Sequence, residues 1–159
     1  MKDASYPRQP HRRAPCGARP KASVADAHGA LAIAKFPKDT VKDGERASYP
    51  EIVDEISRHG VNARADAAEL FRRMVFSILI SNVDDHLRNH GFLWAGKAGW
   101  RLSPAYDLNP TPTDLKARIL TTNISLDEGT CSINLALSQA ELFGLSLADA
   151  RAIVSKGPA

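Results

Sequence analysis

The segment Asp66–Ser81 constrains the fold more than any other, because its apolar residues recur at helical spacing around almost the whole circumference. Those residues are Leu70, Phe71, Met74, Val75, Phe76, Ile78, Leu79 and Ile80. Asp66 and Glu69 resemble a capping box at the start of the helix. A helix with so little polar surface is normally buried. We therefore expect this helix to run through the core.

The rest of the chain divides into shorter elements. Apolar residues between turn signals predict four short strands, at 21–24, 31–36, 91–94 and 100–102. Ser48 and Glu51 form a capping box that predicts a helix ending at Gly60. Two further helix starts are predicted, one at Ser138 and one at Ser146.

Composition limits the class of protein. With 159 residues, 43% of them hydrophobic and 25% charged, the chain suits one globular domain and is unlike a disordered protein. Its longest mainly apolar run, Met74–Ile80, is far shorter than the roughly 20 residues that cross a membrane. Cys16 and Cys131 lack the spacing of a zinc site or a disulfide framework. We therefore expect a cytoplasmic protein with no membrane partner.

The positive charge is concentrated at the start of the chain. Residues 1–21 contain six Lys or Arg and one Asp, whereas the remainder contains 15 Lys or Arg and 17 Asp or Glu. Four prolines, Pro7, Pro10, Pro15 and Pro20, oppose regular structure in this region. We expect residues 1–17 to form a disordered basic arm, with contact to nucleic acid or an acidic partner as the alternative.

The polar segment Ser81–His90 follows the long apolar helix directly and carries the most informative chemistry. Asp84 precedes Asn89 by five positions, which is the Asp-x-x-x-x-Asn interval of the protein-kinase catalytic loop. A predicted hairpin follows, and Asp107 comes after it. In phosphoryl transfer one carboxylate, here Asp84, contacts the attacking hydroxyl. An amide oxygen and a second carboxylate hold magnesium on the nucleotide phosphates, and Asn89 and Asp107 fit these roles.

Two stretches, Asn82–Leu93 and Gly99–Pro110, closely resemble the C-terminal lobe of HipA-type toxin kinases. The motif Asn-x-Asp-x-His-x-(Lys/Arg)-Asn carries the resemblance, and a Tyr-Asp-Leu-Asn-Pro sequence after the hairpin extends it. The resemblance implies a bacterial serine/threonine protein kinase of a type II toxin–antitoxin system, using ATP and Mg²⁺. It also implies a protein substrate and a helix-turn-helix antitoxin partner of the HipB type, with DNA contacted only through that antitoxin.

The resemblance assigns roles residue by residue. It makes Asp84 the catalytic aspartate and places His86 and Arg88 at the catalytic-loop histidine and basic positions. It makes Asn89 a metal ligand and Asp107 the counterpart of the aspartate in the kinase Asp-Phe-Gly motif.

A second patch near the N-terminus resembles the nucleotide-binding strands of the same family. Residues 18–24 are similar to the phosphate-loop strand, and residues 33–37 to the strand that carries the phosphate-pairing lysine. This implies that Lys35 is that lysine and that Lys21 and Ser23 lie at the nucleotide.

The chain departs from the family pattern between these two patches. Only Lys38–Ala47 separates the lysine strand from the helix at Ser48, where family members have a long segment that includes the adenine-binding hinge. We therefore expect a truncated protein-kinase-like α+β fold, with a strand-pair remnant at 18–37 and a mainly helical lobe with a β-hairpin at 48–157. Without the hinge, nucleotide affinity and activity should be impaired.

Three other interpretations of the residues remain open. Asp84, Asp85 and His86 could form a capping and turn cluster without chemistry. Asp84, Asp85, His86 and His90 could instead ligate a transition metal in a hydrolase, although Gly91 leaves no helix for the two histidines to share. Finally, the chain could be a catalytically inactive kinase lobe that binds an antitoxin.

Overall fold

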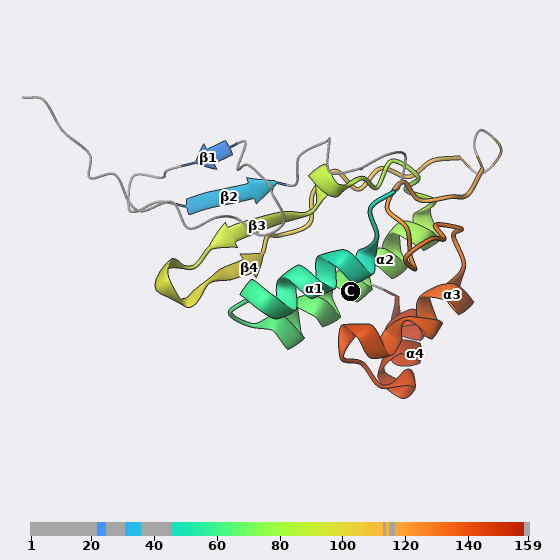
Figure 1. The fold of residues 1–159 in the computed structure, drawn as a ribbon. Helices are drawn as coiled ribbons and strands as arrows, with labels where there is room; N and C mark the ends of the chain where they lie inside the picture. Colours follow the sequence, from blue (N-terminus) through green and yellow to red (C-terminus); the bar gives the residue numbers. More distant parts are fainter. Residues whose placement is uncertain (1–21, 25–30, 36–45, 113, 115–116, 158–159) are drawn as a thin grey trace, which may run out of the picture.

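The computed structural model describes residues 22–24, 31–35, 46–112, 114 and 117–157, with side chains from residue 46 onward. The described residues form an α+β fold in which an antiparallel sheet lies on one side and the helices on the other (Figure 1). The prediction for residues 1–17 lies outside the described residues. No helix in the described ranges has both the length and the apolar character needed to cross a bilayer.

The sheet described by the structure has four strands in the order β1-β2-β3-β4. The strands are β1 (Ala22–Val24), β2 (Leu31–Lys35), β3 (Gly91–Trp94) and β4 (Trp100–Leu102). The four predicted strands are therefore confirmed, within one residue at their ends. β2 pairs with β3 although more than 50 residues separate them, and this pairing sets Lys35 opposite Gly91. In the β3–β4 hairpin, Trp94 and Trp100 are paired and their rings make an edge contact at 4.9 Å.

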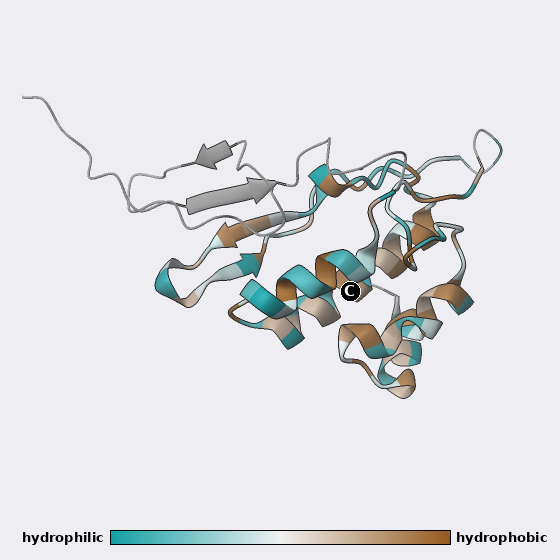
Figure 2. Ribbon diagram, in the orientation of Figure 1, coloured by the Kyte–Doolittle hydropathy of each residue, from teal (hydrophilic) through white to brown (hydrophobic). Residues whose placement is uncertain are grey.

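Helix α1 (Tyr49–His59) begins and ends as the sequence predicts. The Glu51 carboxylate accepts hydrogen bonds from the Ser48 backbone N–H at 2.7 Å and from the Ser48 hydroxyl at 2.8 Å. Gly60 follows the helix, and a Cβ there would lie 2.4 Å from the carbonyl oxygen of Ile56. The helix is amphipathic (Figure 2), and its apolar face packs on α2. Its capping box therefore fixes the start of the helix that places Tyr49 in the core.

Helix α2 (Ala63–Ile80) starts three residues earlier than predicted, and the capping box at Asp66 and Glu69 is wrong. The Asp66 backbone N–H already donates to the Asn62 carbonyl as part of the helix, at 2.9 Å. Its buried carboxylate instead accepts a hydrogen bond from the Leu102 backbone N–H at 3.0 Å, which ties α2 to β4. The prediction that α2 runs through the core is confirmed for most of its length, although Leu79 is half exposed.

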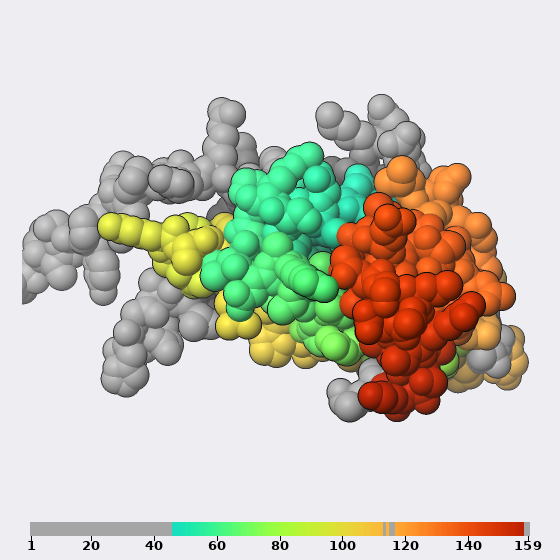
Figure 3. Space-filling view, turned by 90° about the horizontal axis from the view of Figure 1, so that it is seen from below, coloured from blue at the N-terminus to red at the C-terminus, as the bar shows by residue number. Residues whose placement is uncertain are grey.

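The C-terminal part closes the core. It comprises α3 (Ile133–Ser138), a short 3₁₀ helix η4 (Ala140–Phe143) and α4 (Leu147–Lys156). It packs beside the earlier helices (Figure 3). The predicted start at Ser146 is confirmed, since its hydroxyl accepts a hydrogen bond from the Asp149 backbone N–H. The predicted start at Ser138 is wrong, because Ser138 ends α3 and Ser132 provides the N-cap of that helix.

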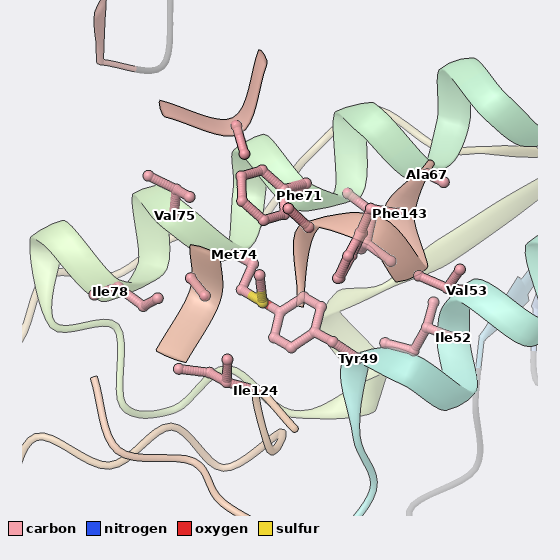
Figure 4. Packing of buried hydrophobic residues seen from close by; sticks show 14 of the residues in the cluster. Tyr49, Ile52, Val53, Ala67, Phe71, Met74, Val75, Ile78, Ile124 and Phe143 are labelled. Atoms are coloured by element: carbon pink, nitrogen blue, oxygen red, sulfur yellow. The ribbon is translucent and has the colours of Figure 1, made fainter. Parts of the chain in front are cut away.

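The hydrophobic core lies between α1, α2 and the C-terminal helices (Figure 4). Its largest fully buried side chains include Tyr49, Phe71 and Phe143. The rings of Phe71 and Phe143 meet edge to face at 5.3 Å, a favourable geometry for an aromatic pair. The loop after α2 therefore starts from a rigid and well-packed support.

Candidate functional site

The candidate site begins where α2 ends. Ser81 adopts the left-handed conformation (φ 56°), and its backbone N–H donates to the Ile78 carbonyl. Arg118 secures this end of the helix: its guanidinium donates to the Ser81 hydroxyl at 3.0 Å and to the Ile78 carbonyl at 2.8 Å. Because a left-handed residue turns the chain sharply, residues 82–90 leave the helix axis at a fixed point.

Asp84 and Asn89 are connected within this loop. Asn89 is the last residue of the 3₁₀ helix η2 (Leu87–Asn89), and its amide Nδ2 donates to the Asp84 carbonyl at 3.2 Å. Since the nitrogen is used inside the loop, Oδ1 is the amide atom that remains for a cation. Asp84 itself is exposed, whereas Asn89 is buried. This arrangement leaves the Asp84 carboxylate accessible to a second molecule.

The side chains of His86 and Arg88 contact each other. Arg88 Nη2 lies 3.0 Å from His86 Nε2. A guanidinium can only donate hydrogen bonds, so in this contact Nε2 of the histidine accepts one. His86 Nδ1 is buried and has no hydrogen-bond partner among the described residues. The contact holds the positive charge of Arg88 within the same loop as Asp84.

The segment after β4 carries Asp107 and is hydrogen-bonded to the same loop. The Tyr106 hydroxyl donates to the Arg88 carbonyl at 2.7 Å, and the Asn109 backbone N–H donates to Asn82 Oδ1 at 3.4 Å. Gly91 permits the close approach of Tyr106, because a Cβ at Gly91 would lie 3.0 Å from the Tyr106 hydroxyl. Two hydrogen bonds thus join the segment that carries Asp107 to the loop of Asp84 and Asn89.

Asp107 has a backbone conformation that few residues other than glycine adopt. Its φ is 59°, and in the described part of the chain only Ser81 shares a positive φ among non-glycine residues. A left-handed non-glycine residue costs about 1–2 kcal/mol, and such residues cluster at functional sites. The Asp107 carboxylate is exposed and accepts a hydrogen bond from Asn109 Nδ2 at 2.7 Å.

The oxygen-rich character of these groups fits magnesium. An amide oxygen from Asn89 and a carboxylate from Asp107 are the hard ligands that this ion prefers, with waters and phosphate oxygens completing its shell. The pKa of Tyr106 next to Asp107 is raised, chiefly by burial and then by the negative charge of Asp107. Tyr106 therefore stays neutral and remains a hydrogen-bond donor to the Arg88 carbonyl.

The N-terminal candidates are described only in part. Lys35 is the last residue of β2, and its backbone is paired with Gly91, one residue after His90. Ser23 lies in the middle of β1, opposite Ala32. Lys21 lies outside the described residues. The sheet thus brings the strand of the predicted lysine next to the predicted catalytic loop.

A buried polar cluster lies behind the loop, and the sequence analysis did not predict it. The Tyr49 hydroxyl donates a hydrogen bond to Asp85 Oδ2, and His90 Nε2 lies 3.1 Å from Asp85 Oδ1. Tyr49 and His90 also make an edge contact between their rings at 5.3 Å. Although the Asp85–His90 distance suits an ion pair, neither ring nitrogen of His90 has a well-directed hydrogen bond among the described residues. The adjacent acids at 84 and 85 were the one available signal.

This cluster corrects the hydrolase interpretation. Asp85 and His90 are buried and face each other, whereas Asp84 is exposed and His86 contacts Arg88. The four side chains therefore do not form one ligand set. Within the described ranges, no group of three or more His, Cys, Asp or Glu residues is placed to hold a metal ion. The predicted ligand set of Asp84, Asp85, His86 and His90 for a transition-metal hydrolase is therefore wrong.

Burial of Tyr49 predicts a specific loss of stability in alkali. Burial, followed by the negative charge of Asp85, raises the pKa of Tyr49 well above its ordinary value of 10.0. Above pH 10 the unfolded chain loses the Tyr49 proton while the folded chain keeps it. The free energy of unfolding should therefore fall as the pH rises, by up to about 1.4 kcal/mol per pH unit from this group.

Urea denaturation at several pH values between 8 and 11 measures this effect. Tyr49→Phe should be less stable at pH 8, since it lacks the hydrogen bond to Asp85, but should lose less stability between pH 10 and 11. Tyr106 is present in both proteins, so its own ionisation cancels in the comparison. Parallel stability curves for the two proteins would contradict the assignment to Tyr49.

Comparison with known proteins agrees with this architecture. Residues 38–156 match the family model of the HipA-like C-terminal domain, and the chain therefore belongs to this family. It is 32% identical over 89 residues to a "Putative kinase" of Haemophilus influenzae. This aligned region covers 54% of this chain and 26% of that protein. The chain is 51% identical over 47 residues to the "Putative kinase Y4dM" of Sinorhizobium fredii, covering 30% of this chain and 12% of that one.

A solved structure has the same fold. A chain of the complex of HipA, HipB and operator DNA from the toxin–antitoxin system of Shewanella oneidensis MR-1 superimposes with a TM-score of 0.57 and 19% sequence identity. The match covers 76% of this chain and 29% of that chain. The matched regions thus span 12% to 29% of the lengths of these three proteins.

Proposed function

We propose that the chain carries the catalytic segment of a HipA-type toxin kinase, which transfers a phosphoryl group from ATP to a protein serine or threonine. One observation carries the proposal: in a HipA-like C-terminal domain, the loop of Asp84 and Asn89 is hydrogen-bonded to the segment of Asp107. A carboxylate, an amide and a second carboxylate on adjoining loops form the set of groups that phosphoryl transfer requires.

In this proposal Asp84 accepts a hydrogen bond from the attacking hydroxyl and orients its oxygen toward the phosphate. Asn89 and Asp107 hold magnesium, which neutralises charge on the phosphate oxygens when it is bound. The contact between His86 and Arg88 keeps a cation next to the loop, and the Tyr106 hydroxyl fixes the backbone of Arg88.

Nucleotide binding is the second part of the proposal. Lys35 pairs with the phosphates, and its strand partner Gly91 directly follows the loop of Asn89 and His90. Lys21 and Ser23 lie at the same nucleotide. Only residues 36–48 lie between β2 and α1, so we propose weak adenine binding and a low transfer rate.

The partners follow from the same assignment. The solved relative is a complex of HipA with HipB and operator DNA, and by analogy we propose a HipB-like helix-turn-helix antitoxin as the partner of this chain, in the bacterial cytoplasm. DNA would be contacted only through that antitoxin. The acceptor is a hydroxyl of a protein substrate.

Thermal unfolding with ATP, in the presence and absence of Mg²⁺, tests this function. At an ATP concentration ten times the dissociation constant, binding should increase the free energy of unfolding by about 1.4 kcal/mol and raise Tm by about 3–6 °C. The rise should require Mg²⁺. Asp107→Ala and Asn89→Ala should each remove most of the Mg²⁺-dependent part, because each removes a proposed ligand.

Asp127→Ala is the matched control, since Asp127 is an exposed loop aspartate that contacts only Ser125 among the hydrogen bonds described. This variant should respond to ATP and Mg²⁺ as the parent chain does. No change of Tm at millimolar ATP with Mg²⁺ would refute the kinase proposal. The catalytically inactive, antitoxin-binding module would then be the better assignment.

A further inference from the structure

Two residue pairs with the same spacing occur side by side in the loop after α2. Asp84 and Asn89 form the first pair, and Asp85 and His90, one position later in each case, form the second. In the first pair the Asn89 amide donates to the Asp84 carbonyl, and in the second the two side chains meet at 3.1 Å. Asp84 is exposed, whereas Asp85 and His90 are only 1% and 3% exposed. Asn89 of the first pair is also buried, so Asp84 alone of the four is exposed. The second pair, here called the inner pair, therefore repeats the spacing of the first with both members buried.

The inner pair is anchored to three separate parts of the fold. The Tyr49 hydroxyl, at the start of α1, donates to the Asp85 carboxylate. The Asp85 backbone carbonyl accepts two hydrogen bonds from Thr122, one from its N–H at 2.8 Å and one from its hydroxyl at 2.6 Å. His90 immediately precedes β3 and packs edge-on against the Tyr49 ring. Helix α1, the segment at Thr122 and the residue that precedes β3 therefore meet at Asp85.

Burial of the Asp85 carboxylate at this position is energetically unfavourable. Placing it out of water costs free energy that one tyrosine hydrogen bond and a histidine contact offset only in part. Apolar residues of similar volume would fill the same space at lower cost. Such a group is understandable where a particular geometry must be held, and here the neighbours along the chain are the two predicted functional residues.

We propose that Asp85, held by Tyr49 and His90, is a positioning residue that sets Asp84 and Asn89 relative to each other. The inference rests on the roles proposed above for those two residues. Adjacent Cα atoms are fixed at 3.8 Å, so holding Asp85 against His90 limits how far Asp84 and Asn89 can separate. Asp85 touches neither substrate nor metal in this scheme and acts only through its neighbours.

Asp85→Asn tests the proposal, with Asp66→Asn as the matched control. Both aspartates are buried and both accept a hydrogen bond, but Asp66 holds the Leu102 backbone N–H and is remote from the loop along the chain. Two measurements are made on each variant of the full chain: the NMR signals of the Asn89 side-chain amide, and the affinity for Mn²⁺ alone by electron paramagnetic resonance. Thermal unfolding measures the stability of each.

We expect Asp85→Asn to shift the Asn89 amide signals, to speed their exchange with solvent, and to lower Mn²⁺ affinity about tenfold. Asp66→Asn should leave both unchanged even if it lowers Tm by as much. Equal effects of the two variants on the Asn89 signals would overturn the proposal, because Asp85 would then be a purely structural residue. If Asp85→Asn does not fold, Tyr49→Phe replaces it and should produce the same changes in smaller degree, whereas unchanged Asn89 signals in Tyr49→Phe would overturn the proposal.

The proposed metal site and the proposed positioning role of Asp85 can be refuted separately. If the parent chain does not bind Mn²⁺, the metal role of Asn89 is refuted, and the NMR signals alone then decide whether Asp85 positions the loop. If Mn²⁺ binds and is lost in Asn89→Ala, but Asp85→Asn changes neither readout, the metal site stands and the positioning role is refuted.

Discussion

Asp84→Asn is expected to lower the rate of phosphoryl transfer about 10²- to 10⁴-fold, the range for losing a positioned general base. The amide keeps the size of the side chain and can still accept a hydrogen bond, but it cannot take up the hydroxyl proton as a carboxylate can. Since Asp84 is exposed and only its backbone carbonyl is hydrogen-bonded to Asn89, the fold and the loop should remain intact. Transfer of radiolabelled γ-phosphate from ATP to proteins of a bacterial extract measures the rate.

Binding measurements separate the role of Asp84 from a role in nucleotide affinity. Asp84→Asn should bind ATP and Mg²⁺ as the parent chain does, because the proposal assigns nucleotide binding to other residues. Asp127 is an exposed aspartate in a loop far along the sequence from Asp84, and Asp127→Asn should transfer phosphate at the parent rate. Equal transfer rates in Asp84→Asn and the parent would exclude Asp84 as the catalytic carboxylate.

Phe143→Ala is expected to reduce the free energy of unfolding by about 3–5 kcal/mol. Phe143 is fully buried and its ring lies edge to face with Phe71 of α2, so truncation removes apolar area and leaves a cavity in the middle of the core. Urea denaturation of the purified variant measures the loss. A loss of this size is a large fraction of the stability of a typical domain.

The neighbouring residue provides the control. Leu142 belongs to the same 3₁₀ helix but is 54% exposed, so Leu142→Ala should change stability by about 0.5 kcal/mol or less. Similar losses for the two variants would mean that η4 does not pack on α2 as described.

Elements defined by local chemistry could be predicted from the sequence. The Ser48–Glu51 capping box and Gly60 fixed both ends of α1, and the turn-flanked apolar runs fixed the β3–β4 hairpin to the residue. Asp66 misled the prediction of the start of α2, because its partner is the backbone of Leu102, 36 residues away. Nothing near Asp66 in the sequence indicates that contact. The short helix α3 was missed because Ser138 also fits a helix start.

The candidate site was predictable to a similar extent. The spacing of Asp84 and Asn89, followed by a hairpin and Asp107, is a local pattern and therefore visible in the sequence. The role of Asp85 depends on Tyr49 and Thr122, which lie 36 and 37 residues away in opposite directions. Adjacent aspartates look alike in a sequence, and only tertiary contacts distinguish the buried one from the exposed one.

The contacts of Asp84 with Asn89 and of Asp85 with His90 fix the number of residues in this loop. Adding or removing one residue between Asp85 and His90 would break the register of both pairs at once and would turn a buried carboxylate toward the wrong neighbours. The tip of the adjacent hairpin, Gly96–Ala98, is exposed and carries no such double constraint. Length variation among natural relatives should therefore accumulate at that tip and spare the loop one strand away.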